Sequence, residues 1–183
     1  MNIQNPYGIP IFIAFLLMFP VCLHADGYVI GTYGIGGKIS EPSYGMEIGG
    51  VFLSDLHPTG GALSLGLGVS VGDTDENPPD ATIPPSGLTP SYVLEYNDGN
   101  EQDIYMSLGA ELVPALFMVA GVGYATQDVI TLGRYTDTLY RIDSETQNNV
   151  TFLFGLRYLI EGLNAGLGFD SRRGVLVNIG IAF

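Results

Sequence analysis

The densest set of catalytic residue types in the sequence is Ser54, Asp55 and His57. Serine, histidine and a carboxylate are the nucleophile, the base and the orienting group of many hydrolases. Here they are almost adjacent, in a stretch that continues to Gly61 and predicts a turn. Neighbours at one strand end do not converge on a single reacting atom without special geometry. We therefore expect a turn at this position and no catalytic triad.

A second candidate is the acidic stretch 73–77, which reads Asp-Thr-Asp-Glu-Asn. Its oxygen-bearing side chains are spaced as in the opening of an EF-hand calcium loop. Pro78 stands where that loop requires glycine, and no Glu follows at the twelfth position. We therefore expect a solvated acidic loop, with neither a metal site nor a cofactor.

Two adjacent arginines, Arg172 and Arg173, are the third candidate. Arginine pairs with phosphate through two hydrogen bonds, so these residues could contact the phosphates of lipopolysaccharide. The alternative is that they form only the polar tip of a hairpin. The sequence leaves both interpretations open.

The elements that must position these residues are indicated by side-chain alternation. Large apolar residues occupy every second position in several segments of about ten residues, most clearly in 63–71, 150–158, 163–169 and 175–183. A strand sends alternate side chains to opposite faces, so each segment has one apolar face. The other face is mostly glycine with few charges, whereas a soluble sandwich would carry Lys, Glu and Thr there. Apolar outside and small or polar inside is the pattern of an antiparallel transmembrane β-barrel.

The C-terminal segment resembles the outer-membrane β-barrel proteins of Gram-negative bacteria, whose chains commonly end on Phe after apolar residues at alternate positions. Ile179, Ile181 and Phe183 match this feature. The resemblance implies residence in the cell outer membrane, contact with its lipid and lipopolysaccharide, and reading of the terminal strand by the barrel-assembly machinery. It identifies a class of fold and no activity.

Residues 1–25 have the composition of a secretory signal peptide. An apolar stretch runs from Ile9 to Leu23, and Ala25 offers a small residue for cleavage before Asp26. Met1 to Gly8 lacks Lys and Arg, which departs from the usual pattern. We expect cleavage after residue 25, leaving the barrel domain 26–183 without cysteine.

The number of strands depends on two ambiguous segments. Residues 88–97 and 103–112 predict a hairpin around Asp98-Gly99, a strong turn pair. Residues 128–149 are rich in Thr, Tyr and Ile, but Arg134 and Asp137 interrupt any apolar face. Counting both gives ten strands, which we favour. Placing both outside the membrane gives eight, which is the alternative.

Charge constrains both the partners and the interior. The net charge of −13 argues against nucleic acid as a partner. If each strand keeps its register, the inward face carries five charged residues, which are Glu47, Glu95, Glu111, Arg157 and Asp170. Charges in a dry interior must pair, protonate or stay hydrated. We expect Arg157 to bridge carboxylates across a mostly occluded lumen.

These observations predict a non-catalytic, monomeric outer-membrane barrel with a structural or surface role, or a narrow pore that prefers cations. Two alternatives come from other classes. One is an outer-membrane enzyme that modifies lipid, which the shortage of histidine disfavours. The other is a secreted soluble barrel that binds an apolar ligand and has its faces reversed, with Leu and Val inside.

Overall fold

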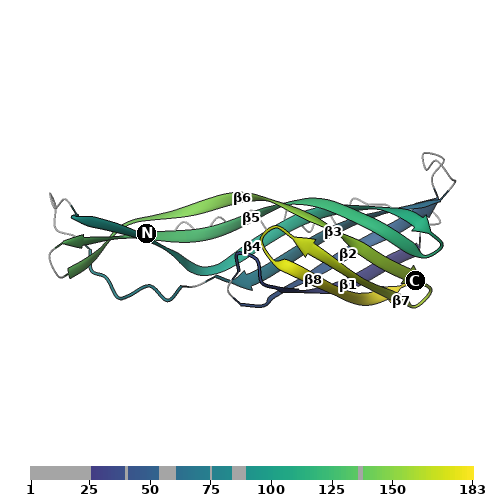
Figure 1. Ribbon diagram of the computed structural model, residues 1–183, viewed down its shortest axis with the longest axis horizontal. Helices are drawn as coiled ribbons and strands as arrows, with labels where there is room; N and C mark the ends of the chain where they lie inside the picture. Colours follow the sequence, from purple (N-terminus) through teal and green to yellow (C-terminus); the bar gives the residue numbers. More distant parts are fainter. Residues whose placement is uncertain (1–25, 40, 54–60, 75, 84–89, 136–137) are drawn as a thin grey trace.

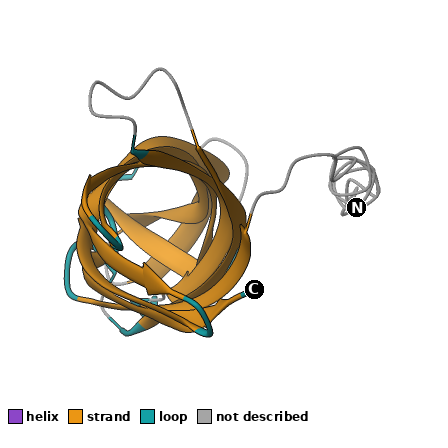
Figure 2. Ribbon diagram, turned by 90° about the vertical axis from the view of Figure 1, so that its right-hand side faces the viewer, coloured by secondary structure: helices purple, strands orange, loops and turns teal. Residues whose placement is uncertain are grey.

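The described part of the computed structural model is a single closed barrel of antiparallel strands. It comprises residues 26–39, 41–53, 61–74, 76–83, 90–135 and 138–183. Each strand pairs with the next along the chain and β8 pairs with β1, so the ring has no free edge (Figure 2). The strands are β1 (Asp26–Ile35), β2 (Ser43–Leu53), β3 (Ala62–Asp73), β4 (Tyr92–Val113), β5 (Leu116–Tyr135), β6 (Thr138–Ile160), β7 (Leu163–Asp170) and β8 (Gly174–Ala182).

The prediction of ten strands is wrong, and the alternative of eight is confirmed. The turn expected at Asp98-Gly99 does not form, because β4 runs through it as one strand of 22 residues. A shift in register between Asp98 and Gln102 absorbs the turn residues, and Gly99 there has a φ of 79°. The segment 128–149 is likewise no separate strand, since it is divided between the end of β5 and the beginning of β6.

Three strands continue well beyond the ring. β4, β5 and β6 have 22, 20 and 23 residues, whereas the other five have 8 to 12. Their far halves form a sheet, called the extension here, made of residues 92–98, 128–135 and 138–149 (Figure 1). The segment that follows β3 forms backbone hydrogen bonds with both edges of the extension. Glu76 bonds to the β4 edge, and Thr82 bonds to the β6 edge.

The end of the barrel away from the extension is called the terminal end here. It contains the beginning of β1 and the end of β8. Gly27 and Phe183 exchange two backbone hydrogen bonds of 2.6 and 2.8 Å there. Among the described residues, no helix is long and apolar enough to cross a membrane.

The two faces of the wall differ sharply in chemistry. Apolar side chains cover the outside, where Leu167, Ile179 and Phe154 are 64%, 66% and 61% exposed. The inside carries glycine and polar residues, and β3 alternates buried small residues with partly exposed Leu and Val as predicted. The alternative of a barrel with Leu and Val inside is therefore wrong.

Glycines on the inner face make room for larger side chains from other strands. Gly68 on β3 lies against the ring of Tyr105 on β4, and a Cβ at residue 68 would overlap that ring. Tyr105 is 3% exposed and packs with Phe117, Val119 and Leu153. The glycines thus let one layer of large side chains fill the interior.

We expect Gly68→Val to destabilise the barrel by about 1–3 kcal/mol, because the added side chain overpacks the interior at Tyr105. Equilibrium urea unfolding of the refolded protein measures this. Val69→Ile changes the neighbouring, outward residue and should leave the midpoint unchanged. Equal effects of the two substitutions would show that the faces are misassigned.

Candidate functional site

One deeply buried charge pair joins Arg157 of β6 to Glu47 of β2. Nη1 donates to Oε1 at 2.8 Å and Nη2 donates to Oε2 at 3.1 Å, and the two side chains are only 4% and 2% exposed. Glu47 Oε1 also accepts hydrogen bonds from the hydroxyls of Tyr28 and Ser107, both at 2.8 Å. The arginine lies over the Tyr28 ring, 5.1 Å from its centre. Four strands thus meet at one carboxylate.

A second cluster lies nearer the extension and is centred on Asp170. Its Oδ1 accepts the backbone N–H groups of Arg172 and Arg173, at 2.8 and 3.0 Å. Its Oδ2 accepts from Arg173 Nη2 at 3.3 Å, and the same Nη2 lies 4.0 Å from Asp103 Oδ2. The Arg173 guanidinium also lies 4.9 Å from the centre of the Tyr105 ring. Asp170 therefore shapes the turn and neutralises one of its arginines.

The third cluster closes the mouth of the ring below the extension. Arg172 donates from Nε to Glu101 Oε2 at 2.8 Å, contacts the same oxygen through Nη2, and donates to Gln127 Oε1 at 2.9 Å. Its backbone carbonyl accepts from Lys38 N at 2.7 Å. The turn that carries Arg172 is thereby fixed to the turn between β1 and β2.

One strand face connects the three clusters. Glu101, Asp103, Tyr105 and Ser107 are successive inward residues of β4, and each contacts one of the three arginines or Glu47. Successive inward residues are about 6.6 Å apart along a strand, so the set extends over about 20 Å. The three clusters therefore lie at successive levels of the lumen. Together they are called the ion-pair column here.

The predicted inward charges divide among three positions. Glu47, Arg157 and Asp170 lie in the lumen, but Arg157 bonds to Glu47 and Asp170 bonds to the turn arginines. Glu111 lies at the terminal end, where it accepts from Ala62 N and Ala115 N at 3.0 and 2.9 Å. The expectation for Glu95 is wrong, because it is exposed on the extension, beyond the closed ring.

Neither interpretation left open for Arg172 and Arg173, contact with lipopolysaccharide or a solvated hairpin tip, matches the position of their side chains. Their side chains are 11% and 2% exposed and point into the barrel, where carboxylates occupy them. The buried carboxylates Glu101, Asp103 and Asp170 explain this orientation, since each would otherwise lack a counter-charge. The outer face at the end of β8 exposes Ile179, Ile181 and Phe183.

Several predicted features lie outside the described residues. They are the signal peptide 1–25 and the turn residues Ser54, Asp55 and His57. Within the described segments, no group of three or more His, Cys, Asp or Glu side chains is arranged to hold a metal ion.

The sequence did contain a signal for the missed members of the column. Ile104, Met106 and Leu108 alternate outward, so continuing the alternation backwards places Tyr105, Asp103 and Glu101 on the inner face. The hairpin expected at Asp98-Gly99 left Glu101 outside the predicted strand 103–112, which does contain Asp103 and Tyr105. The local sequence does not predict that Arg172 and Arg173 point inward, because charged residues at a hairpin tip are ordinarily solvated.

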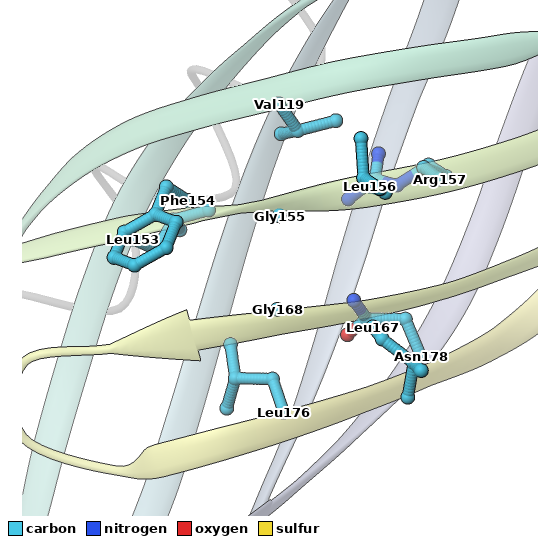
Figure 3. A pocket seen from close by; sticks show the side chains of 10 residues that line it. All are labelled: Val119, Leu153, Phe154, Gly155, Leu156, Arg157, Leu167, Gly168, Leu176 and Asn178. Atoms are coloured by element: carbon cyan, nitrogen blue, oxygen red, sulfur yellow. The ribbon is translucent and has the colours of Figure 1, made fainter.

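Empty space beside the column is small. Gly155 of β6 and Gly168 of β7 are register partners, and the cavity beside them is lined also by Arg157 and Asn178 (Figure 3). It has room for about one water molecule. Arg157 Nε and Asn178 Oδ1 are buried without a hydrogen-bond partner among the described residues. The cavity is therefore suited to hold a bridging water.

We expect Arg157→Met to destabilise the barrel by about 3–5 kcal/mol, because it leaves the Glu47 carboxylate buried without a counter-charge. The double substitution Glu47→Gln with Arg157→Met should recover most of that loss, since no buried charge remains. Urea unfolding of the single and double variants measures the coupling. Additive losses would show that the two side chains do not interact.

No protein-family model matches the sequence, and neither does any curated protein. Among solved structures, one similar chain is Ail, the attachment invasion locus protein of Yersinia pestis, in complex with the heparin analogue sucrose octasulfate. It is 9% identical, with a TM-score of 0.49, and the match covers 87% of this chain and 99% of that chain. A second structure of Ail is 8% identical, with a TM-score of 0.42, and the match covers 87% and 97% of the two chains. Identities this low transfer neither a ligand nor a role.

Proposed function

We propose that this chain is an integral outer-membrane β-barrel that neither catalyses nor conducts, and that anchors the extension at the cell surface. The observation that supports this proposal best is the reversed distribution of side chains, compared with a soluble protein. Apolar side chains cover the outside of the ring, and paired charges fill its inside. A lipid bilayer is the solvent that suits such a surface.

The outer surface supports the membrane location. Monomeric soluble proteins rarely expose contiguous apolar patches larger than a few hundred Å². Here exposed Leu, Ile, Val, Met and aromatic residues occur on every strand of the ring, including Met46, Met106, Phe152 and Val175. The ring closure leaves no unpaired strand edge within it. Together with the predicted signal peptide and the terminal Phe183, this surface favours the outer membrane.

The direction of insertion follows from the two ends of the barrel. Outer-membrane barrels have short periplasmic turns and longer extracellular loops. At the terminal end, Pro114 and Ala115 join β4 to β5, and Glu161 and Gly162 join β6 to β7. The opposite end carries the extension and the described residues 76–83, which bond to it through Glu76 and Thr82. We therefore assign the terminal end to the periplasm and the extension to the exterior.

The ion-pair column supports a sealed lumen over the alternative of a narrow pore. A conducting path needs hydrated space, whereas Arg157, Arg172 and Arg173 each lie across the interior against a carboxylate. Four buried carboxylates, Glu47, Glu101, Asp103 and Asp170, face these three arginines in the described lumen. Any residual leak should therefore favour cations.

A surface role is the consequence of a sealed barrel with a long extension. The extension exposes acidic side chains such as Glu95, Asp143 and Glu145, beside apolar ones such as Tyr92 and Val93. We propose membrane lipid and the barrel-assembly machinery as partners of the monomer, and an external ligand as the partner of the extension.

The membrane location predicts that the mature protein is recovered from the outer-membrane fraction and requires detergent for extraction. The unboiled protein should migrate differently from the boiled protein on a denaturing gel, because the closed ring resists detergent until heated. Recovery in the soluble periplasmic fraction without detergent would contradict the proposal.

The sealed lumen predicts negligible conductance in planar bilayers. Replacing both Arg172 and Arg173 by Ser should create a cation-selective leak, because Glu101, Asp103 and Asp170 lose their counter-charges. Arg141→Ser removes one arginine from the extension, outside the ring, and should create no leak. A large, steady, anion-selective conductance of the unmodified protein would refute both the seal and the sign of its charge.

A further inference from the structure

We propose that the outer surface of the barrel, where the extension begins, contains a binding site for a hydroxylated saccharide ring. The site is a cavity of about 110 Å³ lined by Asn100, Gln102, Thr126, Gln127, Asp128 and Thr146. It lies on the outer side of the wall from the ion-pair column, and Gln127 is the residue that belongs to both. Its position relative to the bilayer rests on the proposed membrane location, but its ligand chemistry does not.

A break in strand pairing creates the cavity. Asp98 pairs with Asp128 and Gln102 pairs with Thr126, so three residues of β4 face the single residue Gln127 of β5. The regular pairing of β4 with β5 is interrupted over this interval, while Thr126 and Asp128 remain paired with β6. The wall is therefore locally open between two continuous stretches of sheet.

The register places this opening directly beyond the apolar surface. Ile104, Tyr124 and Val150 are register partners across β4, β5 and β6, and they are 45%, 47% and 57% exposed. The next outward row towards the extension is Gln102, Thr126 and Asn148, which is wholly polar. In the proposed orientation, the cavity lies at the boundary between the hydrocarbon layer and the sugar-bearing head groups.

The lining offers donors and acceptors suited to hydroxyl groups. Asp128 Oδ1 accepts from the Thr146 hydroxyl at 2.7 Å, which orients the carboxylate. The side-chain amides of Asn100 and Gln102 can each donate and accept. The side chain of Gln127 lies on the inner face, where its Oε1 accepts from Arg172 Nη2 at 2.9 Å, so the amides of Asn100 and Gln102 are the ones available to a ligand outside. A carboxylate surrounded by primary amides can bind several neighbouring hydroxyls at once.

Size, charge and polarity together favour a saccharide. The volume exceeds what a single bound water or bare ion occupies. Asp98 lies 3.7 Å from Arg141, but no described Lys or Arg forms an ion pair with Asp128. That uncompensated carboxylate disfavours phosphate and sulfate groups. The lining is wholly polar, which disfavours an acyl chain.

Nuclear magnetic resonance of the full mature chain in phosphatidylcholine nanodiscs tests the site. One arm adds methyl β-D-glucopyranoside, methyl β-D-galactopyranoside or N-acetyl-D-glucosamine to the solution. The other arm replaces part of the lipid with monoglucosyl diacylglycerol. We expect saturable shifts of the Gln127, Asp128 and Thr146 amide signals in at least one arm, and the responding arm identifies a free or a lipid-linked source.

Two variants make the outcome specific to the cavity. Asp128→Asn should weaken binding about tenfold, because hydrogen bonds to a charged group are the stronger ones. Asn100→Trp should abolish it by filling the cavity. Glu95→Gln removes an exposed carboxylate elsewhere on the extension and should leave binding unchanged. Heat-dependent gel mobility shows whether each variant is folded.

The proposal is overturned if neither arm shifts these signals, or if Asp128→Asn binds as tightly as the unmodified protein. It is also overturned if calcium chloride alone saturates the site and sugars do not compete. Failure of sugar binding in a protein that still inserts and does not conduct would leave the proposed function intact. Sugar binding by a protein found in the soluble fraction would refute the membrane location and leave the saccharide site standing.

Discussion

Closure of the ring by the pairing of β8 with β1 is the constraint on which the other features depend. Once every strand has two neighbours, the backbone groups of the ring satisfy one another and side chains have only two places to go. With most apolar side chains outside, the inner face is filled mainly by glycine, hydroxyl, amide and charged side chains, together with a few buried apolar ones such as Phe117 and Val119. The paired charges of the lumen are thus a consequence of the inverted barrel.

Burying charge is costly unless each charge has a partner in good geometry. The lumen meets this requirement by drawing partners from distant parts of the chain, as when Arg157 of β6 reaches Glu47 of β2 across the ring. Tyr28 and Ser107 supply further hydrogen bonds to the same carboxylate. Such a network places paired side chains across the lumen and also links strands that are not adjacent in the ring.

The interruption of pairing between Asp98 and Gln102 joins two parts with different surroundings. On one side lies a barrel with an apolar exterior. On the other lies the extension, which buries Val129, Ile130 and Leu132 and exposes acidic side chains such as Asp143 and Glu145. Arg172 from the β7–β8 turn closes the lumen at this level by pairing with Glu101, while Gln102 lines the outer cavity. The same irregular stretch therefore contributes to the proposed seal inside and to the proposed saccharide site outside.

The sequence alone determined the class of fold and the identity of the two faces, because alternation is a local property that a strand converts directly into geometry. It predicted the inward position of Glu47, Arg157 and Asp170 for the same reason. Local patterns could not decide whether Asp98-Gly99 turns or is absorbed in a bulge, since a turn pair competes there with continued pairing to β5. That choice set the strand count at eight and moved Glu95 out of the lumen. Nor could they predict that Arg172 and Arg173 point inward, because their carboxylate partners Glu101, Asp103 and Asp170 come together only when the ring closes. Local chemistry thus determined which face each strand buries, and long-range pairing decided which charges meet on it.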